Sequence, residues 1–195
     1  CDIAGSLRRA KEVSGDIDFL VSAKESADII EAFTTRDGVL SVLAAGSTKA
    51  SVLLEGGIQA DLRVVEDSEF ASALAYFTGS KEHNISMRSR AIGRGLRLNE
   101  YGLFKSKEET RDPKLRLDCK TEEAIFAALD LAYVPPELRE DRGEFEAAEK
   151  NEIPRLIEWT DLKGSLHNHS NWSDGHETLE EIAAHMSDLG CAYWA

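Results

Sequence analysis

The segment SGDIDFLV, residues 14–21, sets the architecture of the first third of the chain. A Ser-Gly turn leads into an alternation that grades into an apolar run, which is typical of a buried β-strand. Successive side chains of a strand point to opposite faces, so Asp16 and Asp18 share one face. A second predicted strand, residues 58–65, carries Asp61. We therefore expect three carboxylates to converge from neighbouring strands of one sheet.

Three neighbouring carboxylates predict a site for divalent cations. Carboxylate oxygens are ligands that Mg²⁺ and Mn²⁺ prefer, and a pair of such cations stabilises the attacking and leaving oxygens of a phosphoryl displacement. Without cations, two unit charges 4 Å apart repel by about 4 kcal/mol at an effective dielectric constant of about 20. A lone Asp-x-Asp is more often only a turn, so the residues around it decide between the two interpretations.

A Gly-Ser pair and two arginines precede Asp16 and Asp18. Gly5 and Ser6 lie at a predicted junction between a loop and a helix, where backbone N–H groups and a hydroxyl can receive a phosphate. Arg8 and Arg9 follow, and one of these guanidinium groups can neutralise a polyphosphate. We expect these cations and the carboxylates to hold the same triphosphate.

The remaining pattern predicts an α+β fold with a mixed or antiparallel sheet backed by helices. The first third adds a helix and two strands, over residues 26–33, 38–44 and 49–54. A small α/β subdomain follows, with helices over 68–77 and 84–95, a strand and turn over 96–104, and a helix that begins at Thr121 and stops at Pro135.

These motifs resemble the palm of family X DNA polymerases, within the nucleotidyltransferase superfamily. The matching residues are Gly5-Ser6-x-x-Arg9, Gly15-Asp16-Ile17-Asp18 and Asp61-Leu62-Arg63. The segment YFTGSKEHNISMRSRAIGRGLRLNEYGLF, residues 76–104, is similar to the nucleotide-selecting subdomain of that family. The resemblance covers residues 3–104, with the motifs in the family's order.

The resemblance implies that Asp16 and Asp18 bind both of two metals, Mg²⁺ or Mn²⁺. Asp61 would bind the catalytic metal and help to activate the primer 3'-hydroxyl. Other residues would surround the triphosphate of an incoming dNTP, namely Gly5, Ser6, Arg9 and Gly15.

The second part of the resemblance implies contacts to the sugar, the base and the DNA. Four residues would lie under the incoming sugar: Tyr76, Phe77, Thr78 and Gly79. Asn84 would contact the minor-groove edge of the base, and Arg88 the template strand. Arg63 and Glu100 would form a switching pair that positions the closing subdomain. By pattern alone, Tyr76 and Phe77 are more often core or cap residues. Asn84 is as often a simple N-cap as a base contact, and Arg88 is usually a solvated charge.

Two positions depart from the family pattern. Gln59 stands where well-known members carry an arginine beside the third aspartate, so the basicity of that carboxylate does not transfer from the family. Lys81 stands where some relatives have an acid near the incoming base, so fidelity does not transfer either.

A second motif begins at residue 162, LKGSLHNHSNWSDGHETLEEIA. His167 and His169 are predicted on one side of a strand over residues 163–170, and imidazoles at this spacing suit zinc, manganese or iron. The pattern H-x-H-S-x-x-S-D-G resembles the first motif of PHP domains, metal-dependent phosphoesterases. The resemblance implies that these histidines and Asp174 bind Zn²⁺ or Mn²⁺, and only in the intact protein, because such a barrel needs ligands from later strands.

The expected organisation has four parts. They are a polymerase palm over residues 1–67, a nucleotide-selecting subdomain over 68–136, a linker over 137–161, and a truncated start of a PHP domain over 162–195. Thr178 and Glu181 predict a capping box at the start of a helix in the last part. We expect full activity of the intact protein and little or none of this fragment.

Composition limits the location and the partners of the chain. Its net charge of −13 argues against a nucleic-acid partner when taken alone, but metal-binding carboxylates contribute to that total. No run approaches the roughly 20 apolar residues that cross a bilayer, and three separate cysteines predict no disulfide framework. We expect a cytoplasmic protein without a membrane partner, of undetermined oligomeric state.

The sequence therefore predicts a DNA-directed DNA polymerase that adds a dNTP to the primer end of gapped DNA during repair. Two alternatives stay open: a template-independent nucleotidyltransferase on the same palm, and a PHP phosphoesterase or nuclease in which the palm is a DNA-binding platform.

Overall fold

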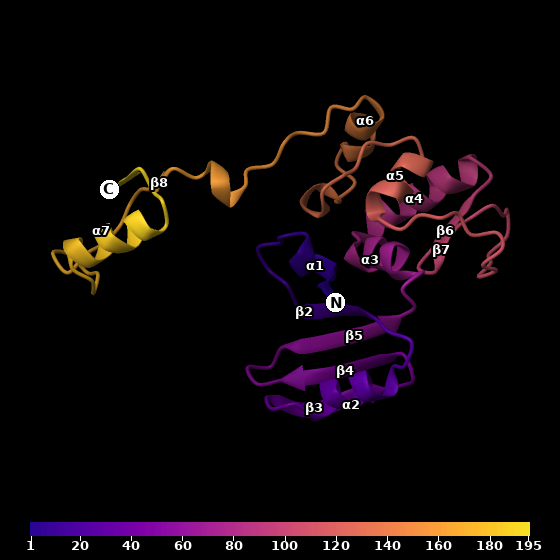
Figure 1. The fold of residues 1–195 in the computed structure, drawn as a ribbon, viewed down its shortest axis with the longest axis horizontal. Helices are drawn as coiled ribbons and strands as arrows, with labels where there is room; N and C mark the ends of the chain where they lie inside the picture. Colours follow the sequence, from indigo (N-terminus) through magenta and orange to yellow (C-terminus); the bar gives the residue numbers. More distant parts are fainter. The chain divides into compact units, whose positions relative to one another are not determined.

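The computed structural model describes residues 1–195, which form two compact units, Cys1–Ile153 and Pro154–Ala195. Figure 1 traces the helices and strands of both units along the chain.

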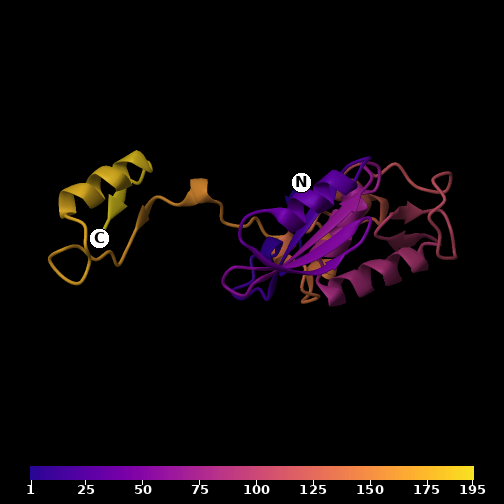
Figure 2. The same cartoon turned by 90° about the horizontal axis from the view of Figure 1, so that it is seen from below.

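A five-stranded mixed sheet forms the first part of unit one, with the strand order β1-β2-β5-β4-β3. Its strands are β1 (Asp2–Ile3), β2 (Asp16–Ser22), β3 (Val39–Ala45), β4 (Lys49–Leu54) and β5 (Gln59–Val65). β2 runs parallel to β5, and every other pair is antiparallel. Helix α2 (Ala27–Thr35) packs along β3 and β4 (Figure 2). The mixed sheet that the sequence predicts is confirmed.

Alternation along β5 explains why the sheet has one buried and one polar face. Ala60, Leu62 and Val64 are buried, whereas Asp61 and Arg63 between them are only half-buried. Because side chains alternate along a strand, the buried face fixes the direction of both polar side chains. A small core joins this sheet to the next helix and consists of Ala4, Leu20, Val65, Ala73 and Leu74, with Phe70 and Phe77 packed against it.

Helices and a hairpin form the rest of unit one. They are α1 (Gly5–Arg8), α3 (Phe70–Thr78), α4 (Lys81–Gly93), β6 (Arg97–Asn99), β7 (Gly102–Phe104), α5 (Glu122–Ala128), the 3₁₀ turn η1 (Pro136–Leu138) and α6 (Glu144–Glu149). Met87, Leu103, Phe126 and Leu129 are at most 3% exposed and lie in the larger core of the chain.

Two helix ends differ from the sequence expectation. The helix expected over 84–95 begins at Lys81, because the hydroxyl of Ser80 accepts a hydrogen bond from the backbone N–H of His83 and caps it. Asn84 is therefore inside the helix and is not an N-cap. The helix capped by Thr121 ends at Ala128, long before Pro135, because Asp130 takes a left-handed φ of 54° that the helix cannot continue.

Residues 137–153, expected in the linker, instead pack into unit one. Ala148 is 3% exposed and belongs to the larger core, with Phe145 and Ile153 packed against it. Glu144 hydrogen-bonds to the buried His83 of α4 at 2.8 Å. Ala148 and Phe145 give α6 an apolar face packed on this core, which a solvated linker would not have.

Unit two is a small βαβ arrangement. It contains η2 (Trp159–Asp161), β8 (Gly164–Ser165), α7 (Leu179–Asp188) and β9 (Tyr193–Trp194), and β8 pairs with β9 in parallel. The capping box of Thr178 and Glu181 is confirmed. The strand expected over 163–170 is wrong beyond Ser165, because the chain bends and His167 takes a φ of 62°. No helix of the chain is both long and apolar enough to cross a membrane.

Candidate active site

The register of two parallel strands brings the three aspartates together. Asp18 of β2 lies opposite Asp61 of β5, and Asp16 lies opposite Gln59. One carboxylate oxygen from each aspartate lies within 4.8 Å of the other two. The sequence placed these residues on two strands, but only the pairing of β2 with β5 shows that they converge.

The three carboxylates affect one another electrostatically. Burial, together with the charges of Asp16 and Asp61, raises the pKa of Asp18 from 3.8 to about 6, and Arg9 partly opposes this rise. A carboxylate whose negative charge is disfavoured in this way gains most from a bound cation. The donor set consists of oxygen atoms only, which fits Mg²⁺ or Mn²⁺.

Asp61 is held by two neutral donors. The hydroxyl of Ser51, its direct neighbour on β4, donates to Oδ1, and the amide of Gln59 donates to Oδ2 at 2.8 Å. An arginine at position 59 would add a positive charge beside this carboxylate, whereas the amide fixes its orientation without one. Ser51 was missed in the sequence, because only the strand register places it opposite Asp61.

Helix α1 begins directly beside Asp18. Gly5 is buried and has a φ of 63°, and a Cβ atom at this position would overlap the Asp18 carboxylate. Ser6 donates a hydrogen bond to the hydroxyl of Ser14 at 3.0 Å, and Gly15 is exposed. The Gly-Ser pair thus lies at the start of a helix, as the sequence predicts, and next to the carboxylates.

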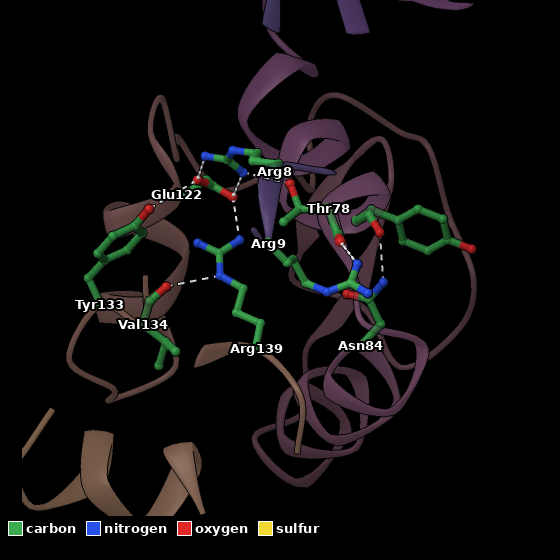
Figure 3. A network of polar contacts seen from close by, with 9 residues as sticks. Arg8, Arg9, Thr78, Asn84, Glu122, Tyr133, Val134 and Arg139 are labelled. Atoms are coloured by element: carbon green, nitrogen blue, oxygen red, sulfur yellow. Dashed lines mark hydrogen bonds and ion pairs between the residues drawn. The ribbon is translucent and has the colours of Figure 1, made fainter. Parts of the chain in front are cut away.

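Arg9 joins α1 to two later segments. Its Nε donates to Glu140 at 2.9 Å. Its Nη1 donates to the backbone carbonyl of Thr78, as Figure 3 shows. The charge of Arg9 also acts on Asp18, where it opposes part of the rise in the pKa of that carboxyl. The expected phosphate ligand therefore lies between the carboxylate cluster and the end of α3.

A buried ion network lies beside Arg9. Glu122 is 5% exposed and accepts hydrogen bonds from Arg8 at 2.6 and 3.0 Å and from Arg139 at 2.6 Å (Figure 3). Burial alone would raise the pKa of Glu122, but the two guanidinium groups outweigh it and hold that pKa below its ordinary value. Arg139 is 1% exposed, and its Nε donates to the carbonyl of Val134. Its buried Nη2 has no hydrogen-bond partner.

The residues expected at the sugar and base lie around the end of α3. Asn84 donates its side-chain amide to the carbonyl of Tyr76 at 2.7 Å, and the Arg88 guanidinium lies 5.9 Å from the Tyr76 ring centre. Tyr76 and Phe77 pack edge to face at 5.2 Å. Thr78 and Gly79 are buried in the same turn, where the Thr78 hydroxyl accepts a hydrogen bond from Arg8.

Arg63 and Glu100 are not paired in this structure. Arg63 instead lies over the Phe77 ring at 4.7 Å, and both charged residues line a cavity of about 200 Å³. In the same cavity Arg111 makes an ion pair with Glu69 at 3.0 Å. The expected switching pair stays a prediction.

Unit two brings the second set of expected ligands together only in part. His169 Nδ1 hydrogen-bonds to Asp174, and the rings of His167 and His169 lie 5.0 Å apart. The three ligand atoms do not form a cluster as tight as that of the aspartates. All three residues lie in the loop between β8 and α7, where Gly175 passes so close to the His169 carbonyl that a Cβ atom would overlap it.

Sequence reasoning missed the residues that bridge distant segments. Glu122 looked like an ordinary acid in the first turn of a helix, and Arg139 and Glu140 like charges in a linker. The one available signal was the density of charge at 137–142, which by itself is typical of a solvated segment.

Comparison with known proteins agrees with this geometry. Residues 73–140 match the family model of the DNA polymerase beta thumb. The chain is 39% identical over 194 residues to the Bacillus subtilis protein named DNA polymerase/3'-5' exonuclease PolX, a match that covers 98% of this chain and 33% of that protein. It is 30% identical over 170 residues to rat DNA polymerase lambda, covering 72% of this chain and 28% of the relative.

A solved structure with a similar fold is also a DNA polymerase. The ternary gap complex of Leishmania infantum polymerase beta superposes with a TM-score of 0.59 at 25% identity, covering 71% of this chain and 61% of that one. The chain spans about a third of the length of the Bacillus subtilis relative. Together, the thumb match, the sequence relatives and the α+β fold make the chain similar to DNA polymerases of the beta, lambda and X types.

Proposed function

We propose that this chain carries the nucleotidyl-transfer centre of a DNA-directed DNA polymerase that adds a dNTP to a primer 3'-hydroxyl. The observation that carries the proposal is the approach of Asp16, Asp18 and Asp61 to within 4.8 Å on two strands next to α1. A bound pair of Mg²⁺ or Mn²⁺ ions would stabilise the attacking and leaving oxygens there.

The proposed roles of the aspartates come from the resemblance. All three would hold the metals, and Asp61 would bind the catalytic metal and help to activate the primer 3'-hydroxyl. Ser51 and Gln59 keep the Asp61 carboxylate in one orientation, because each donates to a different oxygen. The cavity of about 280 Å³ that Asp18, Asp61 and Lys49 line offers room for a primer end.

The triphosphate would lie along α1, against Gly5, Ser6, Arg9 and Gly15. Arg9 keeps three N–H groups free beyond its bonds to Glu140 and Thr78, so it can donate to phosphate oxygens. Tyr76, Phe77, Thr78 and Gly79 would hold the sugar, Asn84 the base and Arg88 the template. Arg63 would leave Phe77 and pair with Glu100 when the subdomain closes.

Gapped DNA is the proposed partner and short-gap repair the proposed setting. The similar Leishmania structures are complexes named ternary gap and ternary primer-template, and the viral relatives are named repair polymerases.

The Asp16→Asn and Asp18→Asn variants test this proposal, with Asp28→Asn on the exposed side of α2 as the matched control. Mn²⁺ binding, followed by electron paramagnetic resonance, should weaken by more than the about tenfold typical of losing a supporting hydrogen bond. Primer extension on gapped DNA should be lost as well. If both variants bind Mn²⁺ as the control does, the proposed centre is wrong. Extension that does not depend on the template strand would favour the template-independent transferase.

We also propose that residues 162–195 are the opening part of a PHP-type phosphoesterase domain. The favouring observation is the grouping of His167, His169 and Asp174 in one loop. The match to the bacterial relative, whose name includes a 3'-5' exonuclease, covers this segment too. The incomplete ligand set predicts weak Zn²⁺ binding by this chain. Tight stoichiometric binding that is lost in His167→Ala would contradict the idea that further ligands are needed.

A further inference from the structure

A carboxylate lies between the two cations at the end of α1. Oε1 of Glu140 accepts a hydrogen bond from Arg9 Nε at 2.9 Å and makes an ion pair with Lys11 Nζ at 3.4 Å. The side chains of Arg9 and Glu140 are only 13% and 20% exposed. The side chains of two cations that lie two residues apart thus converge on one carboxylate oxygen.

This arrangement is the one that recognises a phosphate oxygen. Guanidinium groups bind phosphate through directed N–H groups, and lysine binds it as a point charge. The contacts to Arg9 and Lys11 outweigh burial and lower the pKa of Glu140, so this group is an anion at neutral pH. A carboxylate oxygen therefore fills a place that is built for an anion.

We propose that Glu140 is an intramolecular stand-in for a terminal phosphate and that Lys11 is a further phosphate-binding residue. When a triphosphate tail or pyrophosphate binds, its terminal phosphate takes the place of the Glu140 carboxylate between Arg9 and Lys11. The inference rests on the proposed function, in which Arg9 contacts the triphosphate.

The contacts of Glu140 permit this exchange. Its side chain contacts no hydrogen-bond or ion-pair partner besides Arg9 and Lys11, so turning it toward solvent breaks no other polar contact. Arg9 stays in place during the exchange, because its Nη1 remains bonded to the Thr78 carbonyl. Glu122 differs, because it is buried between two arginines and cannot leave without stranding them.

The Glu140→Gln variant of the full chain tests the stand-in role, with Glu137→Gln as the matched control. Glu137 is exposed in the preceding turn, and its removal changes the net charge equally without touching Arg9 or Lys11. Isothermal titration calorimetry in EDTA would measure the binding of pyrophosphate and of a non-hydrolysable dNTP. We expect Glu140→Gln to bind about three- to tenfold more tightly than the control. Circular dichroism would confirm that both variants are folded.

The Lys11→Met variant tests the second half of the proposal. It should weaken binding of both anions by about three- to tenfold, in the wild-type and in the Glu140→Gln background. If Glu140→Gln binds only pyrophosphate more tightly, the exchange with Glu140 belongs to the pyrophosphate product. If it binds both pyrophosphate and the dNTP more tightly, the exchange belongs to the triphosphate tail.

Two results would overturn the inference. Weaker or unchanged binding by Glu140→Gln would show that Glu140 only holds Arg9, and an unchanged affinity of Lys11→Met in the Glu140→Gln background would remove Lys11 from the site. The metal-free titration separates this inference from the proposed function. A chain that binds anions as expected but does not extend a primer contradicts only the function, whereas one that extends without a Glu140→Gln effect contradicts only the inference.

Discussion

Gly5 is the residue on which the position of Asp18 depends. Its φ of 63° is strained for any other residue, and a Cβ atom would overlap the Asp18 carboxylate. We expect Gly5→Ala to push this carboxylate away from Asp16 and Asp61 and to weaken Mn²⁺ binding by about tenfold or more. Titration followed by electron paramagnetic resonance would measure the loss.

The matched control is Gly93→Ala at the end of α4. No atom lies within 4 Å of the Cβ that this change adds, and the backbone there needs no glycine. This variant should keep the wild-type Mn²⁺ affinity. If Gly5→Ala behaves like Gly93→Ala, α1 does not constrain the carboxylate.

Asp18 also predicts a pH dependence. Its pKa is raised to about 6 in the folded chain, so the proton favours the metal-free folded state below that pH, and this contribution is lost as the pH rises through about 6. A divalent cation competes with the same proton. We therefore expect Mn²⁺ to raise the melting temperature more at pH about 7.5 than at pH about 5.

Differential scanning calorimetry with and without Mn²⁺ at both pH values would measure this difference. The Asp18→Asn variant is the reference, because it cannot bind the proton. An equal Mn²⁺ effect at both pH values would show that the ion binds elsewhere.

At the scale of elements, Glu122 connects α1 with α5 and η1. Two buried or half-buried guanidinium groups depend on its charge. Glu122→Gln leaves both without a counter-charge, and we expect it to lower the free energy of unfolding by about 3 kcal/mol. Urea denaturation followed by circular dichroism would measure this value.

The neighbouring Glu123 supplies the control, because it is exposed in the same turn of α5. Glu123→Gln should change the free energy of unfolding by less than about 0.5 kcal/mol. A similar loss in both variants would point to the helix terminus, and not to the ion network, as the source of stability.

Local patterns predicted the elements better than their ends and contacts. The alternation of β2 and β5 was readable, because a half-buried strand repeats every two residues. The end of α5 at Ala128 was not, because it depends on one left-handed residue, Asp130. The partners of Asp61 and Arg8 were also out of reach, since strand register and buried ion pairs join residues far apart in sequence and leave no local pattern.

At the scale of the molecule, the two units differ in how much they bury. Unit one holds all buried apolar residues, whereas Ser170 is the one residue of unit two in the buried class. Small units with little buried apolar surface are marginally stable. We expect backbone amides of 154–195 to exchange with deuterium much faster than those of α4 and β5, as mass spectrometry would show.

Tryptophan gives a second measure of this difference. All three tryptophans lie in unit two, and Trp159 and Trp172 are 88% and 86% exposed. Thermal unfolding followed by tryptophan fluorescence should therefore show no transition at the temperature where circular dichroism reports the melting of unit one. Coincident transitions would show that unit two is as stable as the sheet.

The parallel pairing of β2 with β5 also bears on how the chain folds. Parallel neighbours need a long crossover, here the whole of α2 and the β3–β4 hairpin, and such distant pairings form slowly. Until that crossover closes, the three acids are dispersed along an open chain. Binding of Mn²⁺ after dilution from denaturant should therefore lag behind the appearance of helix. The rate of Mn²⁺ binding would then report when β2 pairs with β5.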